Sequence, residues 1–96
     1  MDVWGLWDAV AHDRLRYFSS AFKHGFTKED IDTAIERRLA WWIVQEDPLK
    51  VFLLGFNKSQ QILEIGIIDN DGEATVLHSM KARKIYLDRL KKADLL

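Results

Sequence analysis

The chain has 96 residues, of which 48% are hydrophobic and 30% are charged, and its formal net charge is −1. This length suits one small domain and excludes large catalytic scaffolds. The absence of cysteine excludes disulfides and cysteine metal sites, and fits a cytoplasmic location. No apolar run approaches the ~20 residues of a membrane span, and the acidic start lacks the basic segment of a secretory signal. We therefore expect a single domain with no membrane partner.

Positive charge is concentrated at the C-terminal end. Residues 78–96 hold six basic and two acidic side chains, a sum of +4, whereas residues 1–77 hold eight basic and thirteen acidic side chains, a sum of −5. An asymmetry of this kind directs the search for an anionic partner to the C-terminal end, although terminal lysines also serve solubility.

Helical periodicity dominates the first part of the chain. Apolar residues recur there every three or four positions, which predicts one helix over residues 2–23. These residues are Trp4, Trp7, Ala11, Leu15, Phe18 and Phe22. Asp2 is the predicted N-cap and Gly25 the residue that follows the helix. A second helix is predicted over residues 28–38, because Thr27 and the acid three positions later match a capping box.

After Leu39 the pattern becomes that of strands. Four strands are predicted around residues 41–44, 51–54, 62–69 and 74–78. Turns are expected at Asp47–Pro48 and at Asn70–Gly72, where the Asp-Gly pair tolerates positive φ. A last helix is predicted from about Lys81, with Ser79 as its cap. The short connections predict an α+β fold with two N-terminal helices, a four-stranded antiparallel meander and a C-terminal helix.

The predicted C-terminal helix carries the clearest functional candidates. Four lysines, which can bind phosphates, lie opposite its apolar stripe: Lys81, Lys84, Lys91 and Lys92. Arg83 and Tyr86 lie nearer the stripe, and His78 precedes the helix. Cations stabilise a pentavalent phosphate while an imidazole or phenol moves protons, so this set fits metal-free cleavage of RNA. Structural roles at the edge of the core explain Tyr86 and His78 equally well.

Other catalytic motifs are missing from the sequence. It has no phosphate-binding glycine loop, no histidine pair at metal-binding spacing and no nucleophile elbow. His24, beside Gly25, fits a helix C-terminus. We therefore expect no metal and no other cofactor.

Three segments match, in order, the motifs of one family. Lys23–Ile31 matches "kHGvs.eEv", Leu54–Phe56 with Ile62–Ile65 matches "iG…grlLeV", and His78–Tyr86 matches "isARpar..e...Y". In this respect the chain resembles the BrnT-like toxins of the RelE and ParE superfamily, over most of residues 12–90. The resemblance implies a type II toxin-antitoxin system, in which a metal-independent endoribonuclease toxin inhibits translation and a cognate antitoxin neutralises it.

The expected site residues follow from the resemblance and from the lysines of the predicted C-terminal helix. The catalytic candidates are Arg83, Tyr86, His78 and Lys81. The candidates for RNA binding are Lys81, Arg83, Lys84, Lys91, Lys92 and His24. The expected partners are the cognate antitoxin and RNA or the ribosome.

An alternative hypothesis keeps the fold without catalysis, as a protein-binding or regulatory module. It is motivated by four tryptophans, more than a core of this size needs: Trp4, Trp7, Trp41 and Trp42. Under either hypothesis we expect a homo- or hetero-oligomer, joined at the N-terminal helix or at an edge strand of the sheet.

Overall fold

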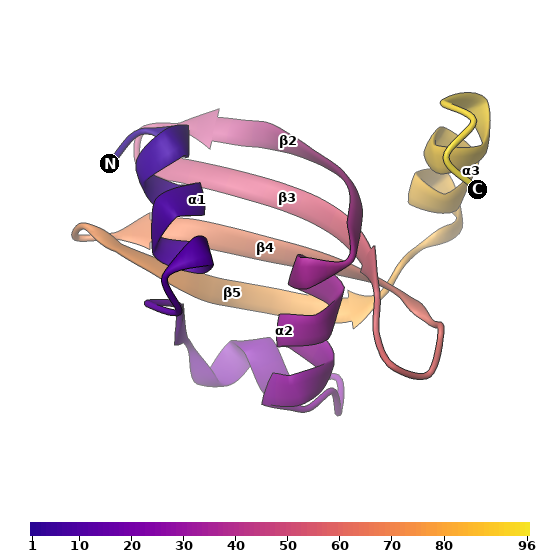
Figure 1. Ribbon diagram of the computed structural model, residues 1–96, viewed down its shortest axis with the longest axis horizontal. Helices are drawn as coiled ribbons and strands as arrows, with labels where there is room; N and C mark the ends of the chain where they lie inside the picture. The colour runs from indigo at the N-terminus through magenta and orange to yellow at the C-terminus, as the bar shows by residue number, and fades with distance from the viewer.

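Five strands form one sheet with helices packed on it (Figure 1). The computed structural model describes all 96 residues. In chain order the elements are α1 (Val3–Ala11), β1 (Arg16–Tyr17), a 3-10 helix η1 (Ser19–Phe22), α2 (Lys28–Glu36), β2 (Arg38–Glu46), β3 (Leu49–Phe56), β4 (Ile62–Asn70), β5 (Glu73–Lys81) and α3 (Lys84–Lys92). The strand order is β1-β5-β4-β3-β2. The α+β class is thus confirmed, and no helix is long and apolar enough to cross a membrane.

Strands β2 to β5 pair antiparallel in chain order, and each is longer than expected. The sheet as a whole is mixed and five-stranded, so the predicted four-stranded antiparallel sheet is not matched. The hairpin between β4 and β5 turns at Asp71 and Gly72, whose φ angles are +51° and +87°, as the Asp-Gly pair predicts. The capping box is also confirmed, since the Thr27 hydroxyl accepts from the Asp30 N–H and the Asp30 carboxylate accepts from the Thr27 N–H. Asp2 caps α1 by accepting from the Gly5 N–H at 2.8 Å.

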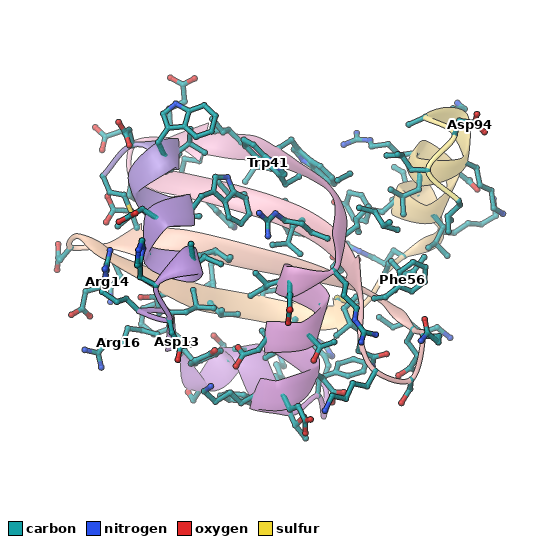
Figure 2. The ribbon with its side chains drawn as sticks, viewed as in Figure 1. Asp13, Arg14, Arg16, Trp41, Phe56 and Asp94 are labelled. Carbon is teal, nitrogen blue, oxygen red and sulfur yellow. The ribbon has the colours of Figure 1, made fainter.

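The single helix predicted over residues 2–23 is wrong. Helix α1 ends at Ala11, and Asp13 then adopts a φ of +57° that turns the chain out of the helix (Figure 2, where Asp13 and Arg16 are labelled). Residues 16–17 form β1, which pairs parallel to β5 and makes the sheet five-stranded rather than four-stranded. Leu15 still packs on the core. The spacing of apolar residues in this segment therefore identified a residue that faces inward, but it did not identify the backbone conformation.

The C-terminal boundary also differs from the prediction. Ser79 is a buried residue of β5 whose hydroxyl donates to the Ala21 carbonyl at 2.6 Å, and so it does not cap a helix. Lys81 ends β5, and α3 begins at Lys84 with Arg83 in the N-cap position.

Helices α1 and α2 cover one face of the sheet (Figure 1) and bury the main core with it. Its largest fully buried side chains are Leu6, Ile31, Ile35, Val51, Leu53, Leu63, Ile65, Ile67 and Val76. Helix α2 approaches β3 closely at Gly55, where a Cβ atom would lie 1.9 Å from the Ala34 carbonyl oxygen. Helix α3 packs against the opposite face at one end, through a small cluster of Leu54, Ala82 and Leu90.

Candidate functional site

The candidate site lies on the sheet face opposite α1 and α2, next to α3. Pairing of Phe52 with Gly66, and of Gly66 with His78, places these residues side by side on β3, β4 and β5. Above them is a depression of about 400 Å³. It is lined by Ser20, Lys23, His24, Lys50, Phe52, Leu77, His78 and Arg83.

A buried carboxylate, Glu64, organises this site from below. The Arg83 N–H and Nε donate to its Oε1 at 3.0 and 2.9 Å, and Arg83 Nη2 donates to its Oε2 at 2.8 Å. His78 Nε2 lies 3.2 Å from the same Oε2. Burial raises the pKa of Glu64, but the hydrogen bonds from Arg83 and His78 outweigh burial and lower this pKa overall. Because the ionised carboxylate only accepts, His78 carries its proton on Nε2.

A second imidazole, His24, faces His78 across the depression. The two ring centres are 6.0 Å apart, and the rings are inclined at 76°. The Phe52 ring stacks on His78, with ring centres 6.0 Å apart and planes inclined at 21°. The segment that carries His24 is tied to β5, because the hydroxyl of Ser20 donates to the Leu77 carbonyl at 2.7 Å. Together with the bond from Ser79 to Ala21, this contact fixes His24 beside the last strand.

The charges that line the depression are all of one sign. Lys23, Lys50 and Arg83 are cationic, and no acidic side chain is among the lining residues. The carboxylate of Glu64, beneath them, is fully buried and paired with Arg83. A local surface of this kind attracts anions even though the whole chain has a net charge of −1.

Aromatic and arginine side chains extend the site toward α3. Tyr86 packs against Phe52 and Trp42, with ring centres 5.4 and 5.7 Å apart. The Arg89 guanidinium lies 4.7 Å from the Trp42 ring, and that of Arg83 lies 5.2 Å from the Tyr86 ring. Aromatic rings and guanidinium planes next to a cationic depression are groups on which nucleic-acid bases stack.

The structure brings together four of the residues singled out in the sequence: His24, His78, Arg83 and Tyr86. Lys81 lies apart from them, because its pairing with Leu63 places it on the helix-covered face of the sheet. Lys84 forms an ion pair with Asp88 at 2.9 Å. Lys91 and Lys92 are exposed in the last turn of α3, outside the depression.

Four residues of the site were missed in the sequence: Lys23, Lys50, Phe52 and Glu64. One signal for Glu64 exists, since this acid lies within the apolar run Ile62–Ile68, and a strand buried on both faces must pair such a group. The other three reach the site only through strand register and the fold of the η1 segment, which no local pattern reveals.

No group of three or more histidine, cysteine, aspartate and glutamate side chains is arranged to hold a metal ion. Comparison of the chain with protein-family models, with curated proteins and with solved structures gives no match.

Proposed function

We propose that this protein is a metal-independent endoribonuclease of the BrnT-like kind, with its catalytic centre in the depression between His24, His78 and Arg83. One observation carries the proposal. Two imidazoles face each other 6.0 Å apart in a depression whose charged lining is entirely cationic, and a buried carboxylate orients one imidazole together with the guanidinium.

In the proposed reaction His78 is the general base. Its Nε2 is bound to Glu64, so Nδ1 takes the proton from the 2′-hydroxyl of the substrate. Glu64 then stabilises the imidazolium that forms, as the carboxylate does in a serine hydrolase triad. The 2′-oxygen forms a bond to phosphorus, and the bond between phosphorus and the 5′-oxygen breaks.

His24 is the general acid of the same step. Its imidazolium donates a proton to the departing 5′-oxygen, which leaves as a hydroxyl, and the other product is a 2′,3′-cyclic phosphate. Arg83 and Lys50 stabilise the extra negative charge on the phosphate oxygens in the transition state. The proton lost by the 2′-hydroxyl and the proton gained by the leaving group balance, so the step needs no other reactant.

The surroundings of the depression support binding of single-stranded RNA. Trp42, Tyr86 and Arg89 offer planar groups for bases to stack on. The exposed lysines of α3, which are Lys84, Lys91 and Lys92, lie on the next element and can hold the phosphate backbone. In the cell, we expect the enzyme to act in the cytoplasm, to inhibit translation and to be covered by an antitoxin.

The test is cleavage of a single-stranded RNA by the purified protein in excess EDTA, with cyclic-phosphate ends as the readout. Replacing His24 or His78 by alanine should lower the rate by about 10²-fold or more. The matched control is His12→Ala, which removes an exposed histidine at the end of α1 and should leave the rate unchanged. Circular dichroism shows whether each variant is folded. No cleavage by the wild type, or equal rates for His78→Ala and His12→Ala, would refute the proposal.

A second function is favoured by a different observation. Apolar side chains are exposed on α1 and β2, with Trp4 71% and Val44 47% exposed, which fits a protein-binding module without catalysis. Under this alternative the depression still binds anions, but RNA stays intact while the protein forms a stoichiometric complex with a partner.

A further inference from the structure

We propose that two copies of this chain pair through the free edge of β2 and form one continuous ten-stranded sheet. Strand β2 lies at one end of the strand order and has a partner only on the side of β3. It is nine residues long, whereas the opposite edge, β1, has two residues. A long unpaired edge strand presents backbone N–H and C=O groups that pair readily with another strand.

The side chains of β2 are more apolar than an exposed edge normally is. Trp41, Ile43 and Val44 are 38%, 41% and 47% exposed. Trp41, labelled in Figure 2, packs edge-on against Trp7 of α1, with ring centres 5.2 Å apart. A partner strand placed along this edge would cover these side chains.

The charges on β2 indicate that the partner is a second copy. Arg38 begins the strand, directly after Arg37, and Glu46 ends it, directly before Asp47. When the same strand is laid beside itself in the opposite direction, the basic end of each copy meets the acidic end of the other. The strand is therefore complementary in charge to its own copy.

Strand geometry restricts the register of this pairing. Residues that pair directly in antiparallel strands have their side chains on the same face of the sheet. In a symmetric dimer one residue of β2 must therefore lie opposite the same residue of the other copy, with the two-fold axis between them. An axis at Trp42 places Arg38 opposite Glu46 and Trp41 opposite Ile43. The pairing with β3 places all four of these residues on the helix-covered face, opposite Gly55, Leu49, Leu53 and Val51 respectively. A shift of the axis to Trp41 or Ile43 loses the charge pairs.

Two irregularities in β2 limit the length of its free edge that can pair with a second copy. The register with β3 shifts between Arg38 and Ala40 and again between Ile43 and Gln45, which leaves residues 40–43 as the regular run. Backbone pairing is centred there, and the long side chains of Arg38 and Glu46 reach across the irregular ends. Both depressions then lie on the same side of the joined sheet, with their β4 strands five strand spacings, or about 24 Å, apart.

The test is the mass of the full chain in solution, measured by sedimentation or light scattering over a range of concentrations. The wild type should form a dimer. Glu46→Arg places arginine against the partner's Arg38 twice per dimer and should raise the dissociation constant by about 10- to 100-fold. The matched control is Glu73→Arg, the same change on β5, which should dimerise like the wild type.

A charge swap provides the decisive measurement. Arg38→Glu alone should raise the dissociation constant to a similar extent, whereas an equimolar mixture with Glu46→Arg should form a mixed dimer at the wild-type concentration range, since both contacts are again complementary. If Arg38→Glu does not fold, because Arg38 also lies 4.3 Å from the Trp7 ring, Arg37→Glu mixed with Asp47→Arg tests the same register. A wild type that is monomeric at every concentration, a dimer that survives Glu46→Arg, or a mixture that stays monomeric would overturn the proposal.

Discussion

Replacing Glu64 by glutamine tests whether this carboxylate holds the site together. Its two oxygens accept four hydrogen bonds, three from Arg83 and one from His78. Each oxygen accepts two of these bonds, whereas glutamine has a single oxygen. The NH₂ group costs least at the Oε2 position, because His78 can accept from it in its other tautomer and only the bond from Arg83 Nη2 is then lost. Loss of one charge-assisted hydrogen bond costs about 1.5–3 kcal/mol. Because the Arg83 side chain is 56% exposed, solvent recovers part of this, and we expect about 1–2 kcal/mol.

For a domain of this size, that loss lowers the melting temperature by about 5–15 °C, which thermal or urea unfolding followed by circular dichroism measures. The pKa of Glu64 is lowered in the folded state from its ordinary value of 4.5. Its contribution to stability is therefore fully present above that pH and is lost as the pH falls through the lowered pKa. Wild type and Glu64→Gln should consequently differ at pH 7 and converge in acid.

The control is Asp88→Asn, which removes a carboxylate paired with Lys84 at the surface and should leave the melting temperature close to that of the wild type. The role given to Glu64 would be refuted by a Glu64→Gln protein as stable as Asp88→Asn, or by a stability difference from the wild type that does not shrink below pH 4.5.

Two further predictions concern the depression and the packing beneath it. Lys50→Ala should weaken RNA binding and reduce the slope of log K against log[salt] by about one, whereas Lys81→Ala, on the other face of the sheet, should do neither. Both are measured by binding titrations at several salt concentrations, and equal effects of the two changes would contradict the placement of the site. Gly55→Ala should destabilise the fold by about 3 kcal/mol or more, because its Cβ would lie 1.9 Å from a backbone oxygen. Gly66→Ala, whose Cβ would have its nearest neighbour at 3.7 Å, should cost clearly less in the same unfolding experiment.

The sequence predicted correctly those features of the fold that depend on a few neighbouring residues. The cap at Asp2, the capping box at Thr27 and the turn at Asp71–Gly72 each depend on a few neighbouring residues, and all three are present in the structure. The helix predicted through residue 23 failed for the opposite reason. Its second half gains backbone hydrogen bonds from β5, a strand more than fifty residues away, and no local pattern records that alternative.

The site was predictable to the same extent. His78 and Arg83 are close in sequence, so their grouping on the C-terminal segment could be predicted from sequence position. Glu64 is not among the site residues expected from the sequence, because its position inside an apolar strand does not show what lies over its side chain. It is covered because α3 and Arg83 fold back over it, so its burial depends on tertiary packing.

The attachment of η1 to β5 has a consequence for the order in which the protein is made. His24 is synthesised early, but the contacts that place it, from Ser20 to Leu77 and from Ala21 to Ser79, are with the last strand. His78 and Arg83 themselves belong to the final fifth of the chain. A translation product that stops before residue 73 therefore has no assembled depression, and the site forms only when synthesis is nearly complete.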